Sequence, residues 1–139
     1  MEIKIILDEM AKMPTKAHET DAGFDLYSPV HCFLPSGESI TIDTGVRMEI
    51  PMGYFGAVRG RSGMAFKSDV TAFDGTLDAY YLGTIGVKLY NHSNKMVSIE
   101  RGDRIAQVVI LPIPKVELVV VDKFAESERG ANGYGSTGK

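Results

Sequence analysis

The strongest constraint on the fold is the regular return of turn residues along the chain. Between residues 30 and 58 the apolar segments are short, and the triplets Pro35-Ser36-Gly37, Asp43-Thr44-Gly45 and Pro51-Met52-Gly53 separate them. Turn signals about 8–12 residues apart are typical of an all-β sandwich or barrel. We therefore expect an all-β fold with strands at 30–34, 39–42, 46–50 and 54–58.

Further strands and one helix complete this expectation. Residues 59–67 carry two arginines and two glycines followed by better helix formers, which predicts a loop leading into one or two helical turns. The run 105–111 is typical of a buried strand, and Pro112 and Pro114 then bend the chain. The remaining expected strands are 2–7, 96–100 and 116–121.

Length and composition fit one compact domain. The chain has 139 residues, of which 44% are hydrophobic, and a domain of this size buries about two-thirds of its unfolded surface. A net charge of −3 and a pI near 5.6 exclude a general attraction to nucleic acids or anionic membranes. Acidic residues interrupt the apolar N-terminal run well before it could span a bilayer or act as a signal core. We expect a soluble, cytoplasmic protein without a nucleic-acid or membrane partner.

Cysteine and histidine usage agrees with this expectation. Cys32 is the only cysteine, so no intrachain disulfide can form and a reducing compartment is indicated. No histidine or cation accompanies Cys32 in a recognisable motif, which favours a packed side chain over a nucleophile. His18, His31 and His92 are far apart in the sequence, and their spacing argues against a zinc site.

The stretch 70–91 combines a strand pattern with reactive side chains. Its first arm reaches Phe73-Asp74-Gly75, and segment 84–89 keeps strand-like alternation, so a β-hairpin is predicted. Asp78 and the pair Tyr80-Tyr81 lie on the returning arm. A carboxylate can act as a general base toward a positioned water, and a ring can pack on a sugar or a base. The alternative is a solvated turn aspartate beside two sheet tyrosines.

Two other segments carry groups suited to an anionic ligand. The backbone N–H groups of Ser62 and Gly63 would be unpaired at a helix start, where anions bind, and Arg61 would add a planar cationic fork. An ordinary capped helix with solvated arginines is the alternative. Gln107 is the one long polar side chain inside strand 105–111. Because an unpaired buried amide is costly, Gln107 is either hydrogen-bonded by the fold or directed at a ligand.

The composition changes after Phe124 to a polar, glycine-rich tail, for which we expect a mobile arm. The tail carries a cation, a ring and two hydroxyls. Residues 133–139 match most of the P-loop pattern, but the required strand-loop-helix context is missing, and we reject that interpretation. A glycine-rich backbone can still wrap phosphate oxygens once it is anchored.

Five segments of the chain follow one another in a fixed order. They read Asp21-Ala-Gly-Phe-Asp-Leu, Gly60-Arg-Ser-Gly-Met-Ala-Phe-Lys, Gly75-Thr-Leu-Asp-Ala-Tyr-Tyr-Leu-Gly, Arg101-Gly-Asp-Arg-Ile-Ala-Gln and Arg129-Gly-Ala-Asn-Gly-Tyr-Gly-Ser-Thr-Gly. Together they resemble the motifs of the trimeric deoxyuridine triphosphatase (dUTPase) family, over most of the chain. Each segment alone is a weak signal, whereas five in order at suitable spacing are hard to obtain by chance.

This resemblance implies a fold, an assembly and a reaction. The implied fold is a distorted jelly-roll-like β-barrel with one short helix in residues 1–124, followed by a flexible C-terminal arm, 125–139, that closes over the active site. The implied assembly is a homotrimer with active sites shared between subunits. The implied reaction is the Mg²⁺-dependent hydrolysis of dUTP to dUMP and pyrophosphate.

The resemblance also implies roles for single residues. Asp78 looks like the base that activates the water attacking the α-phosphate, and Tyr81 looks like the ring under the deoxyribose. Asp25 resembles the acid that helps to hold the metal, through water. The implied substrate contacts are Gly75, Thr76 and Leu77 at the uracil, Arg61, Ser62, Gly63 and Gln107 at the phosphates, and Arg129, Tyr134, Gly135, Ser136 and Thr137 in the arm.

The chain departs from the family pattern mainly around the hairpin. Phe73 and Asp74 stand where small residues are usual, Tyr80 where an acid is common, and Thr84 where Glu is frequent. Because Asp78, Tyr81 and the phosphate-contacting residues are present, these departures bear on the stringency for uracil more than on the chemistry. Two further departures are Gly60 in place of Pro and Tyr134 in place of Phe.

Two alternatives to a dUTPase stay open at this point. A dCTP deaminase would share the fold, but that family places its catalytic glutamate on the strand after the hairpin, where Lys88 stands, and a cation cannot take that role. The other alternative is a nucleotide-binding or regulatory module on the same scaffold. The presence of both Asp78 and Arg129 argues for an active enzyme.

Overall fold

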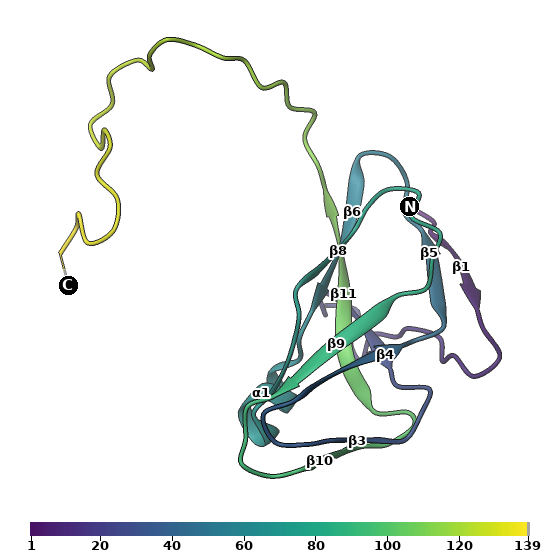
Figure 1. Ribbon diagram of the computed structural model, residues 1–139. Coiled ribbons are helices and arrows are strands. Elements are labelled where there is room, and N and C mark those ends of the chain that lie inside the picture. Colours follow the sequence, from purple (N-terminus) through teal and green to yellow (C-terminus); the bar gives the residue numbers. More distant parts are fainter. Residues whose placement is uncertain (139) are drawn as a thin grey trace.

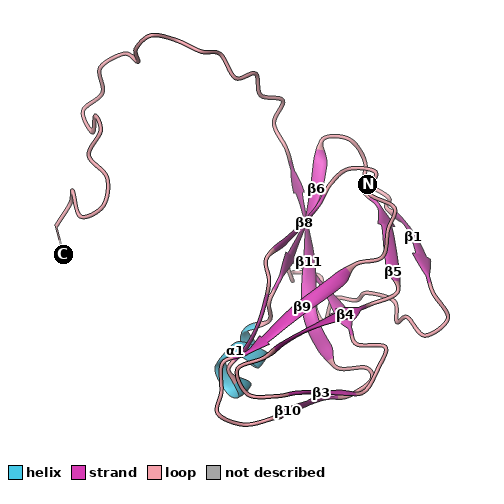
Figure 2. Cartoon of the chain, viewed as in Figure 1, coloured by secondary structure: helices cyan, strands magenta, loops and turns pink. Residues whose placement is uncertain are grey.

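The computed structural model describes residues 1–138, and within this range the chain folds into eleven strands and one short helix (Figures 1 and 2). That helix, seven residues long, cannot cross a bilayer. The elements are β1 Lys4–Leu7, β2 Phe24–Tyr27, β3 Cys32–Leu34, β4 Ser39–Asp43, β5 Val46–Glu49, β6 Tyr54–Arg59, α1 Ser62–Ser68, β7 Val70–Ala72, β8 Gly75–Leu77, β9 Gly86–Asn91, β10 Val97–Ile99 and β11 Arg104–Pro112.

The strands pair into four antiparallel sheets. The largest has the order β2-β11-β6-β8, a second has the order β4-β9-β7, and the pairs β1-β5 and β3-β10 complete the set. Several of these pairings join strands that are distant in the sequence, as in a jelly roll. The expected all-β, jelly-roll-like fold with one short helix is therefore confirmed.

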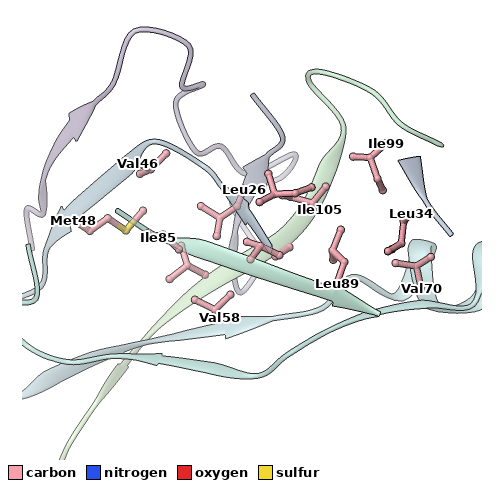
Figure 3. Packing of buried hydrophobic residues seen from close by; sticks show 14 of the residues in the cluster. Leu26, Leu34, Val46, Met48, Val58, Val70, Ile85, Leu89, Ile99 and Ile105 are labelled. Carbon is pink, nitrogen blue, oxygen red and sulfur yellow. The ribbon is translucent and has the colours of Figure 1, made fainter. Parts of the chain in front are cut away.

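The core lies between these sheets, and alternation along β9 shows how the sequence builds it. Val87 and Leu89 are each 1% exposed, whereas the intervening Lys88 is exposed. Because successive side chains of a strand point to opposite faces, β9 covers the core with one face and meets solvent with the other. Side chains from several strands converge on the same interior, among them Leu26, Leu34, Ile99 and Ile105 (Figure 3).

The predicted hairpin at 70–91 is only partly correct. β7 pairs with β9, with Ala72 opposite Leu89, but the chain does not turn back at Phe73-Asp74-Gly75. Instead β8 crosses to the other sheet and pairs with β6. An exposed ion pair of 2.9 Å between Arg59 Nη1 and Asp74 Oδ2 accompanies the crossing. Pairing with β6, a contact distant in the sequence, thus overrides the local turn signal.

The predicted strand at 116–121 is wrong for this chain. The last strand, β11, ends at Pro112, and residues 113–138 contain neither helix nor strand. Leu118 is 93% exposed and Val120 is 100% exposed. A strand needs a hydrogen-bonding neighbour, and after the two prolines the chain leads away from the described sheets (Figure 1).

Candidate active site

Asp25 is the centre of a charged cluster on β2. Its backbone N–H donates to the carbonyl of Thr15 at 2.7 Å, which fixes the residue at the edge of the largest sheet. The carboxylate is 13% exposed and meets two guanidinium groups, Arg61 Nε at 2.9 Å from Oδ1 and Arg104 Nε at 3.5 Å from Oδ2. A carboxylate this deeply buried requires such partners, because desolvation penalises an uncompensated charge.

A pocket of about 250 Å³ opens beside this cluster. Gln107 lies directly opposite Asp25 in the β11–β2 pairing, and its Nε2 donates to the carbonyl of Gly60 at 3.3 Å. The fold thus gives the Gln107 amide a partner, and the side chain also lines the pocket; a contact with a ligand stays a prediction. A Cβ at Gly23 would come within 2.6 Å of Gln107 Oε1, so only glycine leaves that amide in place. The lining residues are Ala17, Asp21, Ala22, Gly23, Asp25, Arg61, Ser62 and Gln107.

The start of α1 forms one wall of this pocket. Arg61 immediately precedes the helix with extended backbone and provides no side-chain cap, and the first turn contains no acidic residue. Ser62 and Gly63 are exposed. The first N–H groups of a helix lack an intrahelical acceptor, so this end offers donors to an anion. The predicted loop-to-helix transition at 59–67 is confirmed.

Asp78 and Tyr81 share one exposed loop after β8. The N–H of Tyr81 donates to the carbonyl of Asp78 at 3.1 Å, which closes a turn between them. Tyr80, inside the turn, has a left-handed φ of 61° and donates its N–H to the carbonyl of Ile50 at 2.9 Å. The loop therefore exposes a carboxylate and a phenol ring within one turn.

β8 itself has one free edge. It is the last strand in the order β2-β11-β6-β8, and within residues 1–138 it pairs on one side only, with β6. Gly75, Thr76 and Leu77 thus leave backbone donors and acceptors on the other side. The backbone groups of such an edge can form hydrogen bonds with a flat heterocycle, as they would with another strand.

The carboxylate loop and the arginine pocket lie at opposite ends of the same strand pair. Gly75 is opposite Val58 and Leu77 is opposite Gly56, so Asp78 continues toward Phe55 while Arg61 lies beyond the other end of β6. Six residues separate positions 55 and 61, which corresponds to roughly 20 Å along an extended chain. One nucleotide phosphate cannot contact both groups of the same chain.

Comparison with known proteins identifies the family. The model of the dUTPase family matches residues 9–138. The chain belongs to the dUTPase family. It is 45% identical over 136 residues to the deoxyuridine 5'-triphosphate nucleotidohydrolase of Clostridium tetani, covering 96% of this chain and 94% of the relative. It is 43% identical over 142 residues to the enzyme of the same name from Nautilia profundicola, covering both chains completely.

Solved dUTPase structures show the same fold. The dUTPase of Staphylococcus bacteriophage 80alpha, in a structure with dUpNHpp, has a TM-score of 0.94 and 33% identity, with 99% of each chain covered. A mutant dUTPase from phage phi11 of S. aureus, described with a structural Mg(II) ion, has a TM-score of 0.85 and 30% identity, covering 91% of this chain and 100% of that one. The fold and the five-segment resemblance therefore agree.

The dUTPase resemblance implies Mg²⁺, with Asp25 as the acid that helps to hold it through water. Among residues 1–138 no group of three or more Asp, Glu, His or Cys side chains lies close enough to hold a metal ion. Each oxygen of Asp25 already faces one guanidinium. This arrangement fits contact through a metal-bound water better than direct coordination, which agrees with the preference of Mg²⁺ for keeping several waters.

Arg104 contacts Asp25, and the sequence did not predict this contact. It lies in the segment Arg101-Gly-Asp-Arg, which reads as a turn, and its side chain is 47% exposed. The β11–β2 register shifts between Arg104 and Ala106, so an irregularity in the strand accompanies its contact with Asp25. Simple alternation along a strand does not reveal such a shift.

The dUTPase arm residues lie apart from both clusters within this chain. Residues 113–138 run away from the sheets (Figure 1), Tyr134 is fully exposed, and Arg129 Nε donates to the carbonyl of Asn132 at 2.9 Å. Gly135, Ser136 and Thr137 are exposed as well. Lys139, the end of the rejected P-loop match, lies outside the described residues.

Cys32 lies on β3 as a half-buried side chain packed against the core. Burial raises the pKa of its thiol, which lowers the fraction of thiolate at neutral pH. This agrees with the predicted packing role.

Proposed function

We propose that the chain hydrolyses dUTP to dUMP and pyrophosphate, with Asp78 as the general base. Membership of the dUTPase family identifies the reaction, and the loop that presents Asp78 beside Tyr81 at the free edge of β8 is the observation that carries the assignment. Asp78 takes a proton from a water as that water attacks the α-phosphorus, and pyrophosphate leaves. No covalent nucleophile is required, so Ser62 is a ligand contact.

The β8 loop binds the nucleoside part of the substrate. The free backbone groups of Gly75, Thr76 and Leu77 pair with the edge of uracil, and the Tyr81 ring packs under the deoxyribose. A ring in this place leaves no room for a ribose 2′-hydroxyl. Phe73, which is 60% exposed near the same edge, is the departure from the family pattern that bears most on stringency for uracil.

The arginine pocket binds the phosphates. A guanidinium has five N–H donors, and Arg61 uses Nε toward Asp25, so its terminal nitrogens are available to phosphate oxygens. The N–H groups of Ser62 and Gly63 and the amide of Gln107 add neutral donors. Asp25 would hold hydrated Mg²⁺, which when bound withdraws negative charge from the phosphates.

A homotrimer with shared sites completes the proposal. Because roughly 20 Å separate the Asp78 and Arg61 regions of one chain, Asp78 of one subunit would act on a phosphate held by Arg61 of another. The arm, residues 125–139, closes over this composite site, bringing Arg129 to the terminal phosphates and Tyr134 over the uracil, with Gly135, Ser136 and Thr137 completing the lid. The cytoplasm, indicated by the single cysteine, is the proposed compartment.

A panel of nucleotides tests the reaction directly. The purified chain with Mg²⁺ is given dUTP, dCTP, dTTP and UTP, and pyrophosphate, dUMP and ammonia are measured. Pyrophosphate and dUMP from dUTP alone are expected. Ammonia from dCTP would indicate the deaminase instead, and no turnover of any nucleotide would indicate a binding module.

Removing residues 129–139 tests the arm. The truncated protein should keep its unfolding temperature, because this segment packs on none of the described sheets. Its kcat/KM for dUTP should fall by about a hundredfold or more, since the Arg129 cation and the lid are lost. Full activity of the folded, truncated protein would contradict the proposed closure.

A further inference from the structure

We infer that Gly83 is a positioning residue that holds the ring of Tyr81 and thereby sets discrimination against a ribose. The inference deepens the proposed function and rests on it, because Tyr81 must lie under the sugar. The residues that seat the ring are Gly83 and Thr84, and we call them the ring seat.

The first observation is a contact that only glycine permits. A Cβ at Gly83 would overlap the hydroxyl oxygen of Tyr81 and would lie 2.6 Å from Cζ and 3.0 Å from Cε2 of the same ring. All three nearest atoms belong to Tyr81. The φ angle of Gly83 is not in the left-handed region, so its backbone conformation is open to alanine. A Cβ at Gly83 would therefore act on the ring, which would have to shift.

The second observation is that the ring seat is anchored to the body of the protein. Tyr81 Oη donates to the carbonyl of Thr84 at 3.2 Å, and Thr84 Oγ1 donates to Asp43 Oδ2 at 2.9 Å. The next residue, Ile85, is 1% exposed and donates its N–H to the carbonyl of Val46 at 2.9 Å. The hydroxyl end of Tyr81 is thus tied to a carbonyl that cannot easily move.

The third observation is that the ring is otherwise free. Tyr81 is 48% exposed, so few other contacts restrict it. A group added at Gly83 would displace the ring without opening a cavity in the core, which predicts a change in substrate selection with little loss of stability. Thr84 stands where glutamate is frequent in the family, and its hydroxyl makes the link to Asp43.

The test compares Gly83→Ala with Gly86→Ala. A Cβ at Gly86 would meet Thr41 Cγ2 at an ordinary 3.6 Å, and Gly86 also lacks a left-handed φ, so it is a matched control. For Gly83→Ala, the ratio of kcat/KM for dUTP over UTP should fall by about ten- to a hundredfold, as expected when a positioning contact shifts by about 1 Å. Gly86→Ala should keep the wild-type ratio, and both variants should keep the wild-type melting temperature.

A double variant shows whether Gly83 acts through the ring. In a Tyr81→Ala background, adding Gly83→Ala should change the ratio by less than about twofold, because the contact no longer exists. Thr84→Val loses the bond to Asp43 and keeps glycine at 83, and it should also lower the ratio of kcat/KM for dUTP over UTP. This variant replaces Gly83→Ala in the test if Gly83→Ala does not fold.

Each result decides the matter. An unchanged ratio in Gly83→Ala, or in Thr84→Val if Gly83→Ala does not fold, overturns the inference. An equal loss with and without the Tyr81 ring also overturns it. A wild-type protein that does not prefer dUTP to UTP would overturn the proposed function itself. Failure of the proposed function is thus seen in the wild type, whereas failure of the Gly83 inference is seen only in the variants.

Discussion

Asp25 illustrates how a single residue connects two arginines beside the pocket. Its carboxylate is held between Arg61 and Arg104, one guanidinium to each oxygen. Arg61 is the more buried of the two arginines, with 30% of its side chain exposed against 47% for Arg104. Asp25 therefore orients Arg61 toward the pocket. The more exposed Arg104 contacts the second carboxylate oxygen of Asp25, Oδ2.

Replacing Arg104 tests this arrangement. In Arg104→Ala, Oδ2 of Asp25 loses its partner and can also contact Arg61. The Asp25 carboxylate then competes with the substrate phosphates for the Arg61 guanidinium. The pair is partly exposed, so the expected effect is about 1 kcal/mol, seen as a roughly fivefold higher KM for dUTP. Steady-state kinetics with Arg104→Lys as the charge-conserving control measures it, and an unchanged KM in Arg104→Ala would argue against the competition.

Asp78 is the residue proposed as the general base. Asp78→Asn removes the proton acceptor while keeping the shape of the loop, so kcat should fall by about 10²–10⁴-fold with dUTP affinity nearly preserved. Asp74→Asn is the matched control, because Asp74 is an exposed carboxylate of the same segment paired with Arg59. Substantial residual turnover in Asp78→Asn, measured against dUTP binding by calorimetry, would exclude Asp78 as the base.

At the scale of the element, β11 organises the site. It is nine residues long and lies between β2 and β6, with Gln107 opposite both Asp25 and Arg59. The three segments that line the arginine pocket are thus brought side by side by one central strand. Because β8 pairs on the far side of β6, the same sheet also carries the carboxylate loop.

The buried face of β9 supports this sheet from across the core (Figure 3). Leu89→Ala removes a fully buried side chain and should destabilise the fold by about 2–5 kcal/mol. Lys88→Ala, one residue earlier on the exposed face, should change the stability by less than about 0.5 kcal/mol. Urea denaturation measures the free energy of unfolding of both variants. Equal losses would contradict the assignment of Leu89 to the buried face of β9 and of Lys88 to the exposed face.

At the scale of the whole molecule, the separation of Asp78 from Arg61 is the central fact. The Asp78 loop and the Arg61 cluster lie at opposite ends of one sheet. This placement is expected if each of them completes a site with the other cluster of a second subunit. The exposed apolar side chains of residues 113–124, Leu118 and Val120 among them, also agree with an assembly in which this segment is covered.

Mixing two inactive variants tests the shared site. Asp78→Asn and Arg61→Ala are each expected to be inactive, but subunits exchanged between them should recover about a quarter of the wild-type activity, because some sites then combine two intact halves. Unfolding, mixing and refolding the two proteins, with sedimentation to confirm a trimer, provides the measurement. No recovery in a mixed trimer, or full activity of a monomer, would contradict the shared site.

The sequence by itself predicted most of the strands and the family. Turn triplets and apolar alternation predicted the strands at 39–42, 54–58 and 105–111, because a strand face is encoded locally by every second residue. The five segments likewise predicted the family and placed Asp78, Tyr81 and Arg61 at named positions. Confirmation of the family leaves the roles of these residues as proposals.

Only the tertiary structure decided which strands pair and how far apart the clusters lie. The crossing of β8 to β6, the contact of Arg104 with Asp25 and the failure of 116–121 to form a strand all depend on neighbours distant in the sequence. Backbone hydrogen bonds in a sheet join residues regardless of their separation along the chain. A local pattern can therefore identify a strand, but its partner is selected by the packing of the whole core.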